Sequence, residues 1–318
     1  MEEERGIRYF PIGLFASVMG FSGLSIAMKQ VESLYHWDHI VSTVILIITS
    51  LLFIFYISVF LYRLIQYWDD VIQDFNHPIK MNFFAAISIS LLLLAAAFLE
   101  ISNMLSFFLW IIGALLQITL TFVILSRLIW IYAFKIEQFN PTWFIPIVGN
   151  IVVPIAGSAH VPEDINWLFF SVGLFFSIVY YAIFFVRAFF YDQIPVKLLP
   201  SFFILMAPPA VGFISYLKMT GNFDSFSYIL FGTAFFIGLL LFFQLKRFFA
   251  IPFFVTWWAF LFPSAAMTIA TGQVFMHTNK VFYEWLFILQ VLGLFVLAVY
   301  LSWRTIELIF KRKLCVKE

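Results

Sequence analysis

Side chains that could carry out chemistry are few in this chain. Of its 318 residues only 11% are Asp, Glu, Lys or Arg, and Cys315 is the single cysteine. One cysteine excludes an intrachain disulfide and a cysteine-based metal cage. The sequence also lacks a Ser–His–Asp grouping, a His-Glu-x-x-His motif and a glycine-rich phosphate loop. An enzyme is therefore not the favoured class, and we expect no cofactor and no metal.

The histidines are the remaining candidates for a metal or oxyanion site. Four of the five fall near the same predicted end of the apolar segments: His36, His39, His160 and His277. No ligand-like spacing joins them. We therefore favour the alternative, in which they are polar residues of the membrane interface.

No ionisable residue can be placed near the middle of an apolar segment. The closest ones lie toward segment ends: Glu100, Arg127, Arg187 and Lys246. Pumps and proton-coupled transporters usually place Asp, Glu or His inside the membrane. Their absence favours passive conduction. A secondary transporter that exports oxyanions or takes up C4-dicarboxylates stays open as an alternative, as does a membrane scaffold without transport.

The elements that must position these residues are long apolar helices. Hydrophobic residues make up 64% of the chain and the mean hydropathy is +1.02, whereas a soluble domain carries about 25% charged residues. A helix crosses a membrane with roughly 20 apolar residues. The sequence predicts an all-α membrane protein with a single transmembrane domain, residues 1–318, and no separate soluble domain. The ten predicted spans are 10–29, 39–66, 82–101, 105–135, 143–161, 164–190, 200–219, 224–248, 252–276 and 281–310.

Basic residues predict the orientation, because Lys and Arg accumulate on the cytoplasmic side. With the N-terminus inside, the inner side collects Arg5, Arg8, Arg63, Lys80, Arg127, Lys135, Arg187, Lys197, Lys246, Arg247, Arg304, Lys311, Arg312, Lys313 and Lys317. Three basic residues fall outside: Lys29, Lys218 and Lys280. We therefore expect both termini in the cytoplasm.

A repeat runs through the spans. Every even-numbered span ends with an arginine among aromatic residues, at intervals of about sixty residues: Arg63, Arg127, Arg187, Arg247 and Arg304. Arginines and aromatics anchor many helix ends at the interface, which is the simpler explanation. We favour a true repeat, in which a helical hairpin is used five times.

The two helices of each hairpin differ in composition. The odd-numbered spans contain eight of the twelve prolines: Pro11, Pro146, Pro154, Pro200, Pro208, Pro209, Pro252 and Pro263. Proline frees a backbone carbonyl inside a helix, which is tolerated at membrane depth only against protein or water. The bulky apolar even spans suit lipid. The pattern thus predicts five inner helices lining a central pore, ringed by five outer helices.

Candidate pore residues follow from this arrangement. Pore kinks are expected at Pro11, Pro146, Pro154, Pro208, Pro209 and Pro263. Small and hydroxyl residues of the same spans are candidates to line the pore: Gly13, Ser17, Gly20, Gly149, Gly157, Ser264 and Thr268.

One aromatic residue stands out as a possible gate. Pro263 leaves the carbonyl of Ala259 without its helical donor, so the ninth span is expected to kink there. The side chain of Phe262, just before that proline, could then project onto the axis, where apolar constrictions close pores by excluding water. The alternative is that Phe262 packs like most of the 45 phenylalanines.

Two segments carry a resemblance to a known family. Residues 8–24 read RYFPIGLFASVMGFSGL and residues 257–267 read WWAFLFPSAAM. Both resemble the TehA/malic acid transporter family, which includes bacterial tellurite-resistance proteins and the slow anion channels of plant guard cells. The third span, 82–101, has no proline, which leaves the geometry of that inner helix open.

The resemblance implies a homotrimer in the bacterial inner membrane, with a separate pore in each protomer. It also implies passage of small monovalent anions such as chloride and nitrate, and it assigns the gate to Phe262. The expected partners are membrane lipid, these anions and further copies of the chain, with no nucleic acid. The residues themselves show no source of anion selectivity, because the predicted pore lacks a ring of Lys or Arg.

Overall fold

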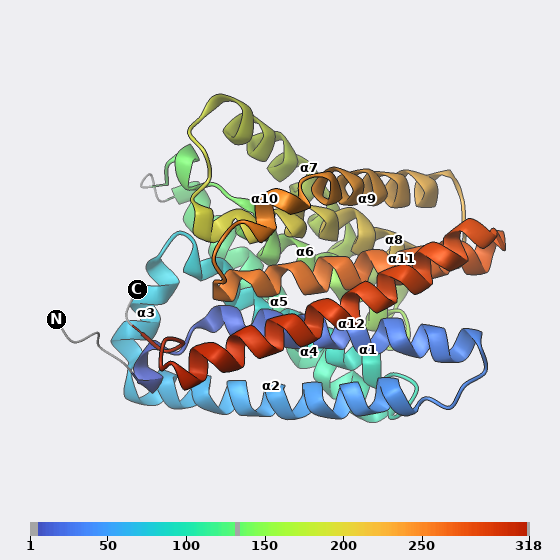
Figure 1. Cartoon of the computed structure of the whole chain (residues 1–318), viewed down its shortest axis with the longest axis horizontal. Helices are drawn as coiled ribbons and strands as arrows, with labels where there is room; N and C mark the ends of the chain where they lie inside the picture. The colour runs from blue at the N-terminus through green and yellow to red at the C-terminus, as the bar shows by residue number, and fades with distance from the viewer. Residues whose placement is uncertain (1–5, 131–133, 317–318) are drawn as a thin grey trace.

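The computed structural model describes residues 6–130 and 134–316, which form an all-α protein (Figure 1). Arg5 and Lys317 of the predicted inner side, and residues 131–133 of the predicted span 105–135, lie outside the described residues.

Within those described ranges, nine helical segments are long and apolar enough to cross a membrane, and a tenth is shorter. In chain order they are Ile12–Leu34, Ile40–Gln66, Lys80–Phe98, Asn103–Trp130, the shorter Pro141–Gly157, Glu163–Phe190, Val196–Thr220, Ser225–Phe243, Val255–Thr278 and Val281–Phe310. The predicted fold class is thereby confirmed, and the protein is a multi-pass membrane protein.

Burial separates these segments into two groups. The five odd-numbered segments contain α1 (Phe15–Leu34), α4 (Ala85–Phe98), α6 (Ile145–Gly157), α8 (Ala207–Thr220) and α11 (Leu261–Thr278). The even-numbered ones are α2 (Ile40–Gln66), α5 (Asn103–Trp130), α7 (Glu163–Phe190), α9 (Ser225–Phe243) and α12 (Val281–Phe310). In the segments that contain α1, α4, α8 and α11, 78–89% of the most apolar stretch is buried, against 28–33% in the even-numbered helices. The predicted inner and outer helices are confirmed.

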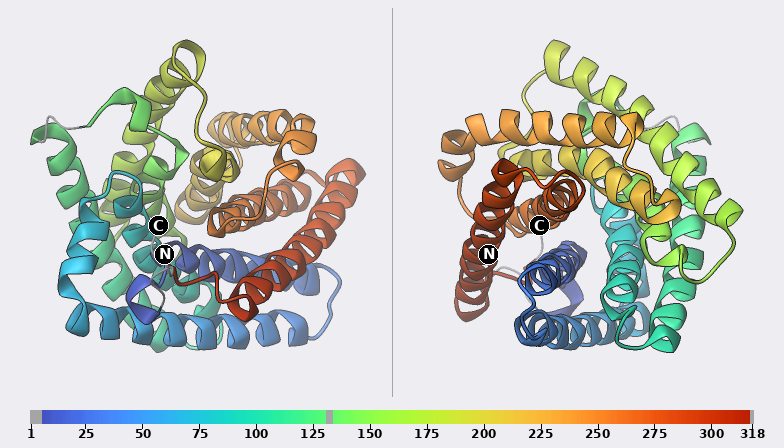
Figure 2. Two further views of the ribbon diagram at one scale, coloured as in Figure 1. Left: turned by 60° about the vertical axis from the view of Figure 1, so that its left-hand side comes forward. Right: turned by 90° about the vertical axis from the view of Figure 1, so that its right-hand side faces the viewer.

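The five inner helices form a closed ring, which we call the inner ring. Contacts run from α1 to α4, then to α6, α8 and α11, and back to α1 (Figure 2). Each outer helix packs on the inner helix of its own hairpin and also on the next inner helix, as α5 does on α4 and α6. The outer helices therefore hold neighbouring hairpins together.

Every inner segment begins as a 3-10 helix and continues as an α-helix. The 3-10 parts are Ile12–Leu14, Lys80–Phe84, Pro141–Phe144, Val196–Met206 and Val255–Phe260. We call the change of helix type the junction. Proline suits the first turn of a helix, where its missing N–H costs no hydrogen bond, and prolines lie at or near four of the five junctions.

The individual prolines occupy the following positions. Pro11 is the N-cap residue of the 3-10 helix Ile12–Leu14. Pro208 and Pro209 fall in the first turn of α8. Pro146 lies in the first turn of α6, whereas Pro154 lies inside that helix. The segment Lys80–Phe98 has the same junction without any proline.

A short helix outside the predicted spans, α3 (Trp68–Asn76), lies beside the end of α2 (Figure 1). Its Asp74 carboxylate pairs with the guanidinium of Arg63 and with the ammonium of Lys80, each at 2.9 Å. Arg63 is buried and also donates to the carbonyl of Phe10 at 2.8 Å. The carboxylate of α3 thus compensates the charge of a buried arginine at the end of an outer helix.

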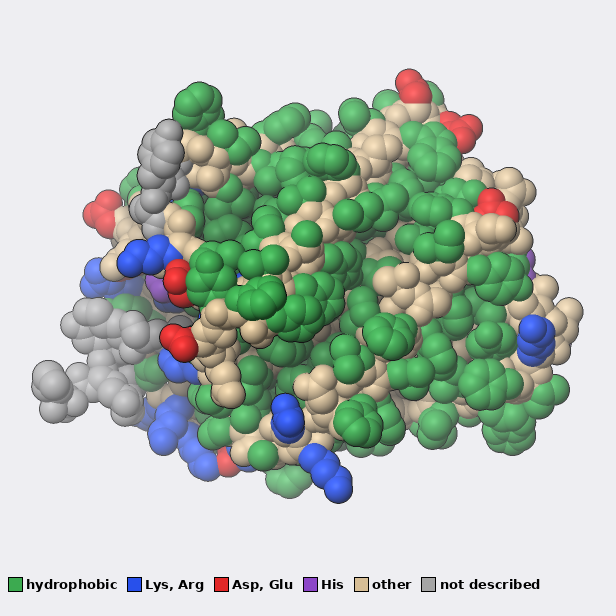
Figure 3. Space-filling view, turned by 90° about the horizontal axis from the view of Figure 1, so that it is seen from above, with side chains coloured by type: hydrophobic (Ala, Val, Ile, Leu, Met, Phe, Trp, Pro, Cys, Tyr) green, Lys and Arg blue, Asp and Glu red, His purple; other side chains and the backbone are tan. Residues whose placement is uncertain are grey.

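Both termini lie at one end of the bundle, which we call the termini end; the opposite end is the far end (Figure 1). The visible surface between the ends is largely hydrophobic, and charged side chains gather mainly toward the ends (Figure 3). This distribution fits a protein whose middle lies in lipid.

Candidate functional site

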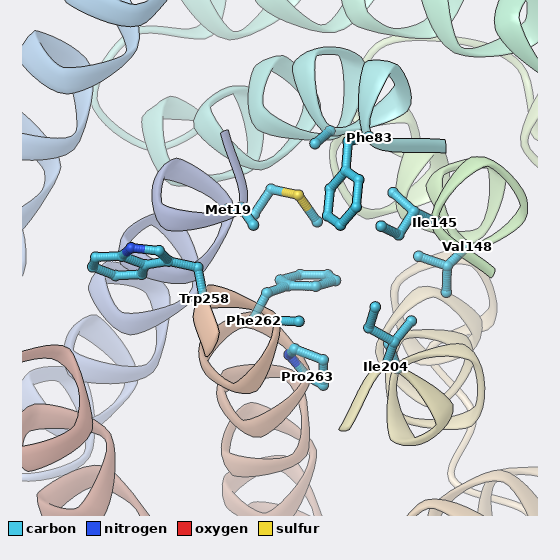
Figure 4. Close-up of a pocket in the computed structure, with 12 residues that line it drawn as sticks. Met19, Phe83, Ile145, Val148, Ile204, Trp258, Phe262 and Pro263 are labelled. Carbon is cyan, nitrogen blue, oxygen red and sulfur yellow. The ribbon is translucent and has the colours of Figure 1, made fainter. Parts of the chain in front are cut away.

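The five junctions meet around a small cavity. This cavity, of about 20 Å³, is lined by apolar side chains from all five inner segments (Figure 4). We call this lining the constriction. Each inner segment contributes a residue one or two positions from its junction: Ala16, Phe83, Ile145, Ala207 and Phe262. The change of helix type therefore places one side chain from each segment at the same point.

Phe262 has a special position in the constriction. Phe262 is only 5% exposed. The next residue, Pro263, also lines the constriction. On the far-end side, Phe262 also lines a larger cavity of about 240 Å³, which we call the far-end cavity. Among the described residues, it is the one that both linings share. Phe262 thus borders both cavities.

The far-end cavity contains charged side chains, unlike the constriction. Lys29 on α1 and Lys218 on α8 line it, together with Glu100, which follows α4. The ammonium of Lys29 lies 2.7 Å from the Glu100 carboxylate. The hydrogen bond from Lys29 lowers the pKa of Glu100, and the positive charge of Lys218 acts in the same direction. The cavity therefore has two cations and one anion.

These two lysines were not among the predicted pore residues. Lys29 and Lys218 do belong to the three basic residues predicted outside, and both lie near the C-terminal ends of inner helices. These two properties together could have indicated a shared cavity, because the far ends of the inner helices surround the axis. The third, Lys280, precedes α12 and does not line the cavity.

The candidate glycines of the fifth span contact outer helices. A Cβ atom at Gly149 would lie 2.2 Å from Oε1 of Gln117 on α5. At Gly157 it would lie 2.3 Å from Oδ1 of Asn166 on α7 and 2.9 Å from Nε1 of Trp110. These glycines permit a close approach between inner and outer helices.

The two candidate glycines of the first span contact neighbouring inner segments. A Cβ atom at Gly20 would lie 2.6 Å from the side chain of Leu261, and one at Gly13 would lie 3.6 Å from Phe83. Gly20 therefore permits a close approach between α1 and α11.

Two of the three hydroxyl candidates donate to backbone carbonyls of their own segments. Ser17 donates to the carbonyl of Leu14 at 2.7 Å, and Thr268 donates to the carbonyl of Ser264 at 2.8 Å. Of the candidate residues, Phe262 and Pro263 are the ones that the structure places in the described cavity linings.

The histidines are dispersed. His160 shares a 2.8 Å hydrogen bond with Ser106, and His277 stacks on Phe223 with 5.0 Å between ring centroids. In residues 6–130 and 134–316, no group of three His, Cys, Asp or Glu could hold a metal ion.

Comparison with known proteins shows the family of this chain. Residues 9–306 match the SLAC1 family, described as voltage-dependent anion channels. An uncharacterized transporter of Methanocaldococcus jannaschii is 25% identical over 299 residues, which cover 85% of this chain and 86% of the relative. A tellurite resistance protein TehA homolog of Haemophilus influenzae is 26% identical over 277 residues, or 85% and 82% of the two chains.

A plant relative is longer than this chain and matches it over part of its own length. The S-type anion channel SLAH2 of Arabidopsis thaliana is 29% identical over 283 residues, which cover 82% of this chain and 52% of the relative. The resemblance inferred from residues 8–24 and 257–267 is confirmed. Because the family match extends over nearly the whole chain, the protein belongs to the SLAC1 family of anion channels and transporters.

Proposed function

We propose that this protein is a gated channel for small monovalent anions such as chloride and nitrate. Each protomer conducts along the axis of its own inner ring, and the phenyl ring of Phe262 occludes the path. The observation that carries this proposal is the position of Phe262 between the two cavities.

The chemistry of the constriction supports a closed state. The side chains of its lining are hydrophobic, and the one N–H among them, the indole of Trp258, donates to Thr305 at 3.0 Å. A partly dehydrated anion would therefore find no free side-chain donor in this lining. Apolar constrictions of this kind block ions by excluding water. Displacement or removal of the phenyl ring would join the two cavities and admit water.

We further propose a homotrimer in the bacterial inner membrane with both termini in the cytoplasm. The trimer rests on the resemblance to the family. The orientation rests on the excess of Lys and Arg predicted at the end where the chain begins, together with the common location of the termini (Figure 1).

A secondary transporter is the second candidate, because Glu100 lies in the far-end cavity as a carboxylate that could exchange a proton. Oxyanion export or C4-dicarboxylate uptake would then depend on that exchange.

Flux from liposomes separates the two functions. We expect wild type and Phe262→Ala to pass chloride and nitrate down their gradients, faster in the variant, at rates that a pH gradient does not change. A saturable flux driven by the pH gradient and abolished by Glu100→Gln would instead establish the transporter. Absence of anion flux from both proteins, with folding verified by gel filtration, would refute the channel.

A further inference from the structure

The far-end cavity has the composition of an anion-binding site. Its two lysines belong to α1 and α8, which are not neighbours in the inner ring. Their ammonium groups therefore approach the cavity from different sides. With one carboxylate, Glu100, the three charged side chains that line the cavity leave an excess of one positive charge.

The two lysines differ in their partners. The ammonium of Lys29 forms an ion pair with the Glu100 carboxylate at 2.7 Å, and the Lys29 side chain is 22% exposed. Lys218 is exposed in the last turn of α8, and its ammonium forms no ion pair or hydrogen bond with the described part of the chain. It is therefore available to an ion that enters the cavity.

A neutral donor lies in the same lining. The side-chain amide of Gln30, next to Lys29, is buried and makes no hydrogen bond with the described residues. This amide packs against α11, where a Cβ atom added at Gly272 would lie 2.6 Å from its Nε2. It borders the cavity without being exposed to it, so the two lysines are the groups that an anion would contact.

We propose that the far-end cavity binds one small monovalent anion between Lys218 and Lys29, and that Glu100 competes with this anion for Lys29. The proposal rests on the channel function above and gives it a source of selectivity. Anions would collect beside the constriction, whereas cations would be disfavoured by the excess positive charge. Glu100 limits the affinity, so the site can release its ion into the pore.

The ion pair also predicts a pH dependence. The groups that act on Glu100 are Lys29 on α1, Lys218 on α8 and His39 before α2, and together they lower its pKa. The carboxylate therefore stays ionised at neutral pH, and the pair with Lys29 is lost only as the pH falls below the ordinary range for glutamate. Acidification on the far-end side is expected to strengthen anion binding, as Glu100→Gln should at neutral pH.

Reversal potentials in the Phe262→Ala background test the site. We expect Lys218→Gln to lower the chloride-to-sodium permeability ratio several-fold, and Glu100→Gln to lower the chloride concentration for half-maximal current several-fold. The matched control is Lys280→Gln, which removes the same charge at the same end but outside the cavity. An unchanged ratio in both Lys218→Gln and Lys29→Gln would overturn the proposal.

Bromide provides a test that does not require conduction. Crystals of the wild-type protein grown in sodium bromide should show an anomalous peak beside Lys218, absent in Lys218→Gln. A wild-type cavity without bromide, or a peak that persists in the variant, would overturn the site. If bromide binds but Phe262→Ala carries no anion current, the proposed channel fails and the binding site stands.

Discussion

Phe262→Ala is expected to raise the anion conductance by roughly tenfold or more over wild type, because an apolar barrier that excludes water is removed. The phenyl ring is the part of the constriction that also borders the far-end cavity. Its truncation is expected to join the two cavities into one lumen, lined by the remaining apolar side chains of the constriction. Currents in planar bilayers or oocytes at fixed protein surface density provide the measurement.

A size series makes this test sharper. Phe262→Leu should conduct less than the alanine variant, and Phe262→Trp should stay closed. The matched control is Phe260→Ala on the same segment, since Phe260 packs on Phe203 and Phe248 at centroid distances of 4.2 and 5.6 Å and does not line either cavity. Wild-type currents from a folded Phe262→Ala protein would eliminate the gate.

Gly173→Ala is expected to destabilise the fold by about 1–3 kcal/mol, the usual cost of overpacking a filled interface. Gly173 lies on α7, where an added Cβ would sit 2.4 Å from Cγ1 of Ile151 on α6. It would also lie 3.0 Å from the backbone nitrogen of Ile151 and 3.1 Å from the carbonyl oxygen of Ile147. Relief therefore requires the backbones of an inner and an outer helix to separate.

Thermal melting in detergent checks this expectation, with Gly232→Ala on α9 as the control. A Cβ at Gly232 would meet no atom within 4 Å, and alanine favours a helix over glycine, so the melting temperature of this variant should equal or exceed that of wild type. The prediction for Gly173 is wrong if the two variants have the same melting temperature.

The distribution of proline, together with the alternation of the two helices in each hairpin, predicted the inner and outer helices, since the inner segment Lys80–Phe98 has no proline. A freed carbonyl has to be shielded from lipid, and that requirement separates the segment of Pro263 from proline-free helices such as α7. The placement of Phe262 on the axis depended on the same proline. Each of these signals lies within one segment of the sequence, so it can be read without knowing which segments contact one another.

Contacts between distant segments could not be predicted in this way. Lys218 follows Lys29 by 189 residues along the chain. The two side chains share a cavity because the inner ring closes. Gly149 belongs to an inner helix, yet its contact with Gln117 points to an outer one. The short, charged helix α3 has no apolar run that a search for membrane spans would detect.

The proline-free segment Lys80–Phe98 makes the same transition from 3-10 to α-helix as its four counterparts. Closely packed neighbours therefore suffice to impose that geometry, and proline assists it without being required. Relatives that share about a quarter of their residues with this chain are therefore expected to keep these junctions where individual prolines are missing. Counting prolines would then underestimate how many divergent sequences share this arrangement of inner helices.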